Sequence, residues 1–178
     1  KPVIGAVNGV AAGFGATFLL AMDHRIAVPD SRFLFPFVRR GIMPESCSSW
    51  FLPRLVGMGA ALDWMLTGRA ISCDEALSKG LIDEVVAPEE LMPRARAYAA
   101  ELAAHCAPAS IAVARQLMWR MAAAPDPHVA HDYESRALAA LLAHPDSVEG
   151  VRSFAERRRP AFTGTGSDAA FMQAWWRN

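Results

Sequence analysis

Three glycines, Gly9, Gly13 and Gly15, separate an apolar segment at residues 3–7 from a second apolar run that begins at Ala16. A buried strand that passes through a glycine-rich turn into a buried helix is typical of α/β folds. The first N–H groups of such a helix have no partner within the helix, and the helix dipole adds positive potential there. The turn therefore either packs tightly or offers free amides to a ligand.

Three common uses of a glycine turn are excluded by single residues. A dinucleotide-binding fingerprint needs a third glycine where Phe18 stands, and a P-loop needs a lysine that this turn lacks. A nucleophile elbow needs a serine where Phe14 stands. The remaining chemical use is an oxyanion hole, in which main-chain amides stabilise an oxygen that gains negative charge during a reaction.

Composition limits the partners of the chain. The formal net charge of the 178 residues is zero, whereas proteins that bind nucleic acid are usually basic, so we expect no nucleic-acid partner. No apolar run reaches the roughly 18 residues of a membrane span, and we expect no membrane partner. Three scattered cysteines favour a reducing compartment, which predicts a cytoplasmic location.

The order of elements predicts an α/β part followed by a helical part. We expect strands at residues 3–7, 24–28, 31–35 and 81–86, and helices at 45–56 and 60–66 separated by Gly57 and Gly59. Ser72 and Glu75 form a capping box for a further short helix. After Pro88 we expect only helices, at residues 89–105, 108–121, 133–142 and 146–158. Because a buried strand is expected directly after Lys1 and Pro2, we expect these residues to be the C-terminal part of a longer protein.

Five segments of the chain resemble the crotonase superfamily, the enoyl-CoA hydratase/isomerase family. In order they are KPVIGAVNGVAAGFGATFLLAMDHRIA (1–27), FLFPFVRRGIMPESCSSWFLPRLVG (33–57), LTGRAIS (66–72), ALSKGLIDEVV (76–86) and SVEGVRSFAERRRPAF (147–162). The resemblance implies a partial α/β core of repeated ββα units at residues 1–107, without the N-terminal part of the fold. It also implies a C-terminal helical oligomerisation region at 108–178 that builds a homotrimer or hexamer.

The resemblance further implies an acyl-CoA thioester substrate and no cofactor, since coenzyme A belongs to the substrate. In this family the central amide of the glycine triplet is the second oxyanion donor, and that position is Phe14, between Gly13 and Gly15. The first donor belongs to the part of the fold that these residues lack. A main-chain donor tolerates a changed side chain, provided that the backbone angles suit phenylalanine.

The resemblance also indicates which positions of the chain would carry the catalytic carboxyl groups. The two positions that carry glutamates in the hydratases hold Thr17 and Phe37 here, so both hydratase acids are missing. Glu45 resembles the single acid of the Δ3,Δ2-enoyl-CoA isomerases, in which one carboxyl moves a proton from C2 to C4. We expect Phe14, Phe18, Phe37 and Trp50 to form apolar walls that raise the pKa of Glu45, and Phe37 and Trp50 to contact substrate.

Other interpretations stay open at this point. The protein is alternatively a hydratase that works with one acid, or a catalytically silent member that binds acyl-CoA. Glu45 would then complement the dipole at the start of a helix. The basic run at 157–159 either meets the phosphates of coenzyme A or ends a solvated helix. His128 and His131 lack the spacing of a zinc motif, and we expect no metal.

Overall fold

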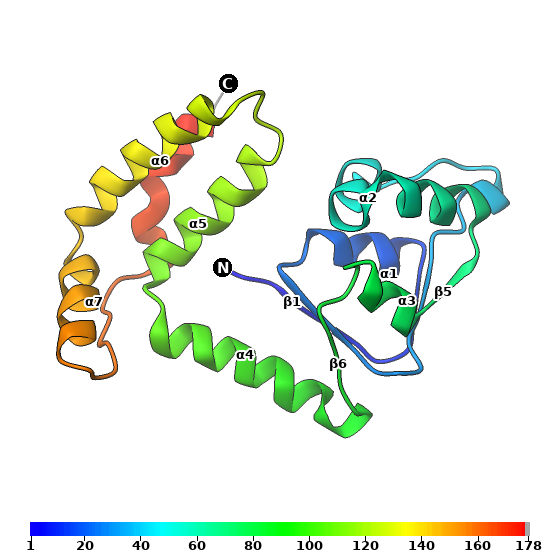
Figure 1. The fold of residues 1–178 in the computed structure, drawn as a ribbon, viewed down its shortest axis with the longest axis horizontal. Helices are drawn as coiled ribbons and strands as arrows, with labels where there is room; N and C mark the ends of the chain where they lie inside the picture. The colour runs from blue at the N-terminus through cyan, green and yellow to red at the C-terminus, as the bar shows by residue number, and fades with distance from the viewer. Residues whose placement is uncertain (177–178) are drawn as a thin grey trace. The chain divides into compact units, whose positions relative to one another are not determined.

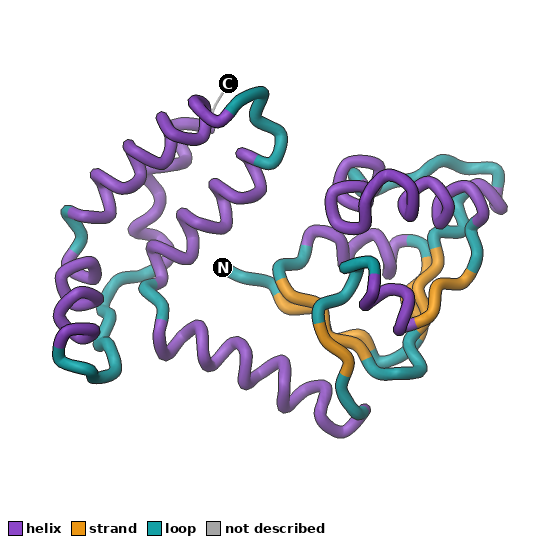
Figure 2. Tube along the Cα trace, in the orientation of Figure 1, coloured by secondary structure: helices purple, strands orange, loops and turns teal. Residues whose placement is uncertain are grey.

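The structure, a computed structural model, describes residues 1–176 and divides into two compact units. The first unit is Val3–Tyr98, and the second joins Lys1–Pro2 to the residues from Ala99 onward. The first unit mixes strands and helices, and the second is helical (Figures 1 and 2). The predicted succession of an α/β part by a helical part is therefore confirmed.

The first unit contains six strands and three α-helices before the start of α4. Its elements are β1 (Ile4–Val7), β2 (Val10–Ala12), α1 (Phe14–Thr17), a 3₁₀ helix (Phe18–Ala21), β3 (His24–Ala27), β4 (Arg32–Leu34), a 3₁₀ helix (Val38–Arg40), α2 (Ser48–Thr67), β5 (Ala70–Ser72), α3 (Cys73–Ser78), β6 (Glu84–Val85) and a 3₁₀ helix (Pro88–Glu90). The strand expected at residues 81–86 is therefore shorter than predicted. Helix α4 (Leu91–His105) begins in this unit and continues into the second one after Tyr98.

The strands form two small sheets. Strands β1, β3 and β6 are all parallel, with β3 in the middle, and Val7 of β1 is paired with Ala27 of β3. In the second sheet β4 is parallel to β2 and antiparallel to β5. Parallel neighbours need covering helices, and the core buries side chains of β4, α2 and β5, among them Phe33, Leu52 and Ile71.

Helix α2 begins three residues later than predicted, at Ser48 rather than Glu45. Ser46 and Cys47 have φ angles of 53° and 57°, in the left-handed region, so the chain makes a turn before the helix can start. The predicted interruption at Gly57 is confirmed as a kink, because its φ of 78° and ψ of 157° are not helical. Glu45 therefore lies in a turn before α2, outside its first helical turn.

The helical unit contains the end of α4, then α5 (Pro108–Met121), α6 (Pro127–Leu142), α7 (Pro145–Ala155) and a 3₁₀ helix (Gly166–Trp176). Helix α6 starts at Pro127, earlier than the predicted residue 133, because Asp126 caps it and accepts the N–H of His128 at 2.8 Å. The C-terminal aromatic residues pack on α5 and α6 of the same chain, where Trp176 Nε1 donates to Gln116 Oε1 at 3.1 Å.

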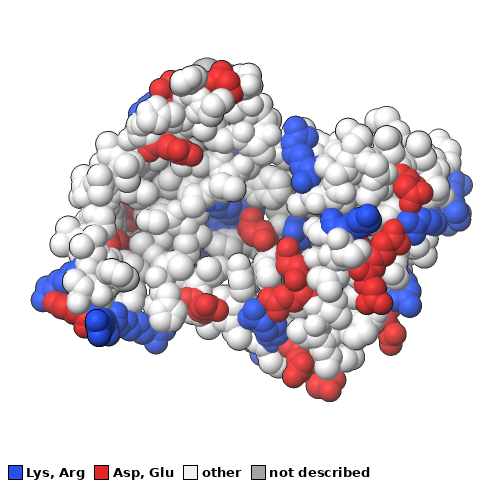
Figure 3. All heavy atoms as spheres, in the orientation of Figure 1, with Lys and Arg blue, Asp and Glu red and all other residues white. Residues whose placement is uncertain are grey.

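Charges are mixed on the surface that Figure 3 shows, in keeping with the formal net charge of zero. In the basic run, Arg158 donates to Glu149 at 2.5 and 2.9 Å and to Glu156 at 2.6 Å, so acidic neighbours already bind its guanidinium. None of the helices within residues 1–176 combines the length and the apolar character that crossing a bilayer requires.

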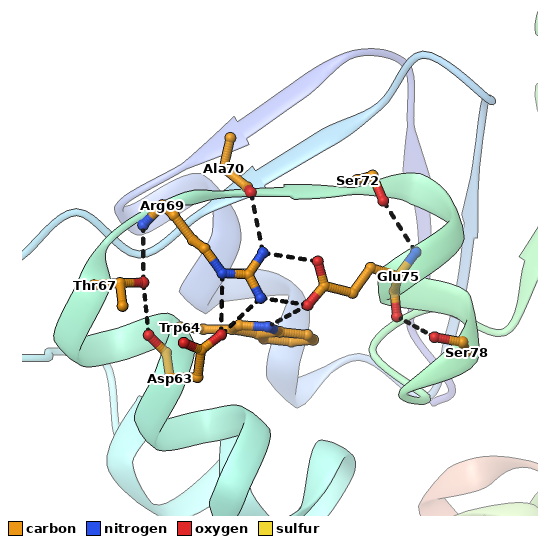
Figure 4. A network of polar contacts seen from close by, with 8 residues as sticks. All are labelled: Asp63, Trp64, Thr67, Arg69, Ala70, Ser72, Glu75 and Ser78. Atoms are coloured by element: carbon orange, nitrogen blue, oxygen red, sulfur yellow. Dashed lines mark hydrogen bonds and ion pairs between the residues drawn. The ribbon is translucent and has the colours of Figure 1, made fainter.

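A polar network joins the end of α2 to α3 (Figure 4). Arg69 donates to Asp63 at 2.6 and 3.0 Å and to Glu75 at 2.5 and 2.8 Å. The indole N–H of the fully buried Trp64 donates to Glu75 Oε1 at 2.9 Å. Ser72 accepts the Glu75 N–H at 3.1 Å, as the predicted cap requires, but the Glu75 carboxylate bonds to Arg69 and Trp64. Hydrogen bonds from Arg69 lower the pKa of Glu75 to about 2.

We predict that Glu75→Leu destabilises the protein more than Glu75→Gln. Leucine leaves the buried Trp64 N–H without an acceptor, which costs about 1–3 kcal/mol, whereas the amide oxygen of glutamine still accepts it. The pKa of Glu75 is lowered from 4.5 to about 2 on folding, so its ionic contribution is present above pH 4.5 and lost as the pH falls towards 2. Urea unfolding at neutral and acidic pH measures both effects, and equal losses for the two variants would contradict this role.

Candidate active site

The glycine turn holds its shape through Gly13. Its φ of 54° and ψ of −123° are unfavourable for a residue with a side chain, and its N–H donates to Leu34 O of β4 at 3.0 Å. Its carbonyl accepts the N–H groups of Ala16 and Thr17, both at 3.0 Å. Helix α1 therefore starts at Phe14, with no side-chain cap on its first N–H groups. The Phe14 amide is one of the first N–H groups of this helix, which have no partner within the helix.

The turn before α2 holds the backbone of Glu45. The Glu45 carbonyl accepts the Ser48 N–H at 3.0 Å and the buried Ser48 hydroxyl at 2.6 Å. The next two residues, Ser46 and Cys47, adopt left-handed angles that cost about 1–3 kcal/mol each and persist only where the surroundings enforce them. Strain of this kind concentrates at functional sites, which makes this turn a candidate for one.

Two hydroxyl groups bind the Glu45 carboxylate. Thr17 Oγ1 donates to Glu45 Oε1 at 2.5 Å, and Ser46 Oγ donates to Oε2. Thr17 Oγ1 also lies 3.2 Å from the Phe14 carbonyl oxygen. The Thr17 side chain therefore joins the turn before α2 to the glycine turn. Its bond holds the Glu45 carboxylate beside helix α1, whose first residue is Phe14.

The pKa of Glu45 is lowered, first by the hydrogen bond from Ser46 and then by that from Thr17. The expectation that apolar walls raise this pKa is therefore wrong. The rings of Phe14 and Phe18 are mostly exposed and stack on each other with centroids 5.6 Å apart. Phe37 packs in the core instead. Hydroxyl donors stabilise the ionised form of a carboxylate, so Glu45 is ionised at neutral pH.

The remaining predicted site residues, Gly15, Phe37 and Trp50, lie in three different surroundings. Gly15 borders a hollow of about 260 Å³ together with Asn8, Gly9 and Leu19. Phe37 is buried, and its carbonyl accepts the Ile42 N–H at 3.1 Å in the loop that leads to Glu45. Trp50 is partly buried in α2, with the Arg54 guanidinium 4.0 Å from its ring centroid. Residues 1–176 hold no group of three or more His, Cys, Asp or Glu residues suited to a metal ion.

Sequence reasoning missed the partners of Glu45. Thr17 is noticeable in the sequence only as a residue that cannot titrate at a position where hydratases carry an acid. Its hydroxyl meets a carboxylate 28 residues further along the chain, and no local pattern encodes that contact. The neighbouring Ser46 gives a weak signal, because a serine beside a glutamate is common on protein surfaces.

The chain matches known proteins over most of its length. The model of the enoyl-CoA hydratase/isomerase family matches residues 1–165. An enoyl-CoA hydratase of Alternaria alternata is 40% identical over 166 residues, which are 93% of this chain and 55% of that protein. A probable enoyl-CoA hydratase of Rhodobacter capsulatus is 39% identical over 163 residues, 92% of this chain and 63% of that protein.

A solved structure has the same arrangement of elements. The crystal structure of a probable enoyl-CoA hydratase/isomerase from Mycobacterium abscessus superimposes with a TM-score of 0.88 at 33% sequence identity. The match covers 93% of this chain and 67% of that one. The chain thus spans about half to two thirds of the length of the relatives that it matches.

We predict that Ser46→Ala raises the pKa of Glu45 more than Thr17→Val does. Both hydroxyl groups lower this pKa, and the bond from Ser46 has the larger effect, so its removal has the larger reverse effect. NMR titration of the side-chain carboxyl carbon measures the change in each variant. An unchanged pKa in both variants would show that neither hydroxyl binds the ionised carboxylate in solution.

Proposed function

Because the chain belongs to the enoyl-CoA hydratase/isomerase family, we propose that it acts on enoyl-CoA thioesters and shifts their double bond from C3 to C2. The observation that carries this proposal is the hydrogen bond that ties the Glu45 carboxylate to the glycine turn, with Thr17 Oγ1 2.5 Å from Oε1. That bond brings one ionisable acid to helix α1, whose N-terminus has no side-chain cap and whose first N–H is the proposed donor to a carbonyl oxygen.

In the proposed mechanism the ionised Glu45 takes a proton from C2 of the 3-enoyl thioester. The electron pair of the broken C–H bond moves into the conjugated system, and the carbonyl oxygen becomes the negative oxygen of a dienolate. The Phe14 N–H donates to that oxygen, and the other donor comes from the part of the family fold that these residues do not contain. The protonated Glu45 then returns the proton to C4, and the product is the 2-enoyl thioester.

The side chains near Glu45 support a reaction with one acid. Thr17 and Phe37 stand at the hydratase acid positions, and neither side chain exchanges a proton near neutral pH. Hydration must activate a water and also deliver a proton to carbon, which usually takes two acids. A double-bond shift needs one group that alternates between base and acid. Because the pKa of Glu45 is lowered, the carboxyl is ionised at neutral pH, which is the form in which this reaction starts.

We propose that the backbone of Gly13 and Gly15 and the side chain of Trp50 contribute to substrate binding, and that Phe37 contributes indirectly. Gly15 borders the hollow beside the turn, and the missing side chain lets the thioester approach the backbone. The buried Phe37 contributes by holding the loop that carries Glu45. Coenzyme A enters as part of the substrate, and the proposal includes no separate cofactor.

A single-acid hydratase is the second candidate, and the names of the relatives favour it. The relatives from Alternaria alternata and Rhodobacter capsulatus are both named enoyl-CoA hydratases, the second as probable. In that case Glu45 would activate water for addition at C3 and then protonate C2. A silent acyl-CoA-binding protein is the outcome if binding occurs without turnover.

We also propose assembly into trimers or hexamers and a cytoplasmic location. Helices α6 and α7 expose several large apolar side chains, of which Phe154 is 87% exposed, and such surfaces favour contacts between subunits. The free thiols of Cys47, Cys73 and Cys106 suit a reducing compartment.

We predict that Glu45→Gln lowers the rate at which the purified full-length protein converts a 3-enoyl-CoA into the 2-enoyl isomer. The amide cannot accept a proton, and loss of a general base typically costs about 10²–10⁴-fold in rate. The assay follows the conjugated product by its ultraviolet absorbance, and a parallel assay follows water addition to a 2-enoyl-CoA.

Glu101→Gln in α4 is the matched control, because it makes the same change at an exposed glutamate in the other unit. It should leave both activities unchanged. Full isomerase activity in Glu45→Gln would refute the mechanism. Water addition that depends on Glu45, without isomerisation, would establish the single-acid hydratase instead.

A further inference from the structure

Thr17 contacts both parts of the candidate site with one hydroxyl group. Its Oγ1 lies 2.5 Å from Glu45 Oε1 and 3.2 Å from the carbonyl oxygen of Phe14. The Thr17 side chain is almost fully buried, with 2% of the residue exposed, so it is placed to act on Glu45 rather than on a ligand. Phe14 is also the residue whose N–H heads helix α1.

This arrangement satisfies both protonation states of the carboxyl. An ionised carboxylate only accepts hydrogen bonds, so the Thr17 proton then points to Glu45 Oε1. A protonated carboxyl can instead donate to a lone pair of Thr17 Oγ1, and the Thr17 proton then turns to the Phe14 carbonyl. Rotation of one hydroxyl therefore keeps the carboxyl in place while it gains and loses a proton.

We propose that Thr17 is a positioning residue that holds the Glu45 carboxyl at a fixed place relative to the Phe14 amide in both its basic and its acidic form. The proposal rests on the proposed function, in which Glu45 takes a proton from one carbon and returns it to another. Both transfers need the carboxyl in one place, because a misplacement of 1 Å can cost about a hundredfold in rate.

Ser46 provides an internal comparison. It also donates to the Glu45 carboxylate, but it is the adjacent residue and moves with the same turn. Thr17 belongs to helix α1, so its bond fixes the distance between two separate segments. Ser46 also has the larger effect on the pKa of Glu45. Removal of the Thr17 hydroxyl therefore tests mainly the position of the Glu45 carboxyl, and removal of the Ser46 hydroxyl tests mainly its pKa.

The test compares Thr17→Val, Thr17→Ser and Ser46→Ala in the purified protein. We measure kcat and KM for a 3-enoyl-CoA across the pH range, and we determine a crystal structure of Thr17→Val. Valine has nearly the shape of threonine but no hydroxyl group, whereas serine keeps the hydroxyl. We expect Thr17→Val to lower the pH-independent kcat about tenfold to a hundredfold with little change in KM. Thr17→Ser should restore most of that loss.

Ser46→Ala should show the opposite pattern. Its loss raises the pKa of Glu45, so the acid limb of the kcat profile moves to higher pH while the plateau changes little. Equal plateau losses in Thr17→Val and Ser46→Ala would overturn the proposal, because position would then not distinguish them. A Glu45 carboxyl that stays in place in the Thr17→Val crystal would overturn it as well.

The outcomes separate this proposal from the proposed function. If Glu45→Gln abolishes isomerisation but Thr17→Val keeps full kcat, the mechanism stands and the role of Thr17 fails. If the parent protein isomerises no 3-enoyl-CoA, the proposed function fails and the positioning role of Thr17 fails with it. If Glu45 is then displaced in the Thr17→Val crystal, the Thr17–Glu45 hydrogen bond has a structural role alone.

Discussion

The hydrogen bond from Thr17 to Glu45 joins the two segments from which the candidate site is built. One segment is the four-residue helix α1, whose start is set by the turn at Gly13. The other is the turn before α2, in which left-handed backbone angles at Ser46 and Cys47 precede the first helical residue. Without the 2.5 Å contact, the adjacent Ser46 would still bind the Glu45 carboxylate, but no bond from helix α1 would fix its place. The site therefore depends on a single tertiary contact more than on either segment alone.

Strand pairing and one main-chain hydrogen bond fix the position of the glycine turn. Strand β1 pairs with β3, and the chain between them passes through β2 and α1. Gly13 is held to β4 by its bond to Leu34 O, so the start of α1 is fixed against the second sheet. A backbone fixed in this way suits an oxyanion donor, since preorganised dipoles need little rearrangement when charge develops. The Phe14 amide meets this condition whatever side chain the residue carries.

The sequence predicted much of the fold because apolar periodicity and glycine positions are local signals. The crotonase fold implied by the resemblance is confirmed by the family match and by a TM-score of 0.88 to a solved relative. The predicted start of α2 is wrong, because no local sequence pattern shows that Ser46 and Cys47 adopt left-handed backbone angles. The predicted direction of the pKa shift of Glu45 is also wrong. Four aromatic residues, Phe14, Phe18, Phe37 and Trp50, were expected to surround the carboxyl, whereas the shift comes from two hydroxyl groups, one of them 28 residues away.

The threonine at position 17 and the glutamate at position 45 are best understood as one physical unit. The resemblance aligns Thr17 with a catalytic glutamate of the hydratases. A glutamate at position 17 would bring a second carboxylate close to Glu45, and two neighbouring carboxylates raise the pKa of one of them because both cannot easily ionise. A hydroxyl at position 17 has the reverse effect, since it donates to Glu45 and lowers its pKa. The apparent loss of an acid at position 17 is thus what allows Glu45 to be held close to the glycine turn in its ionised form.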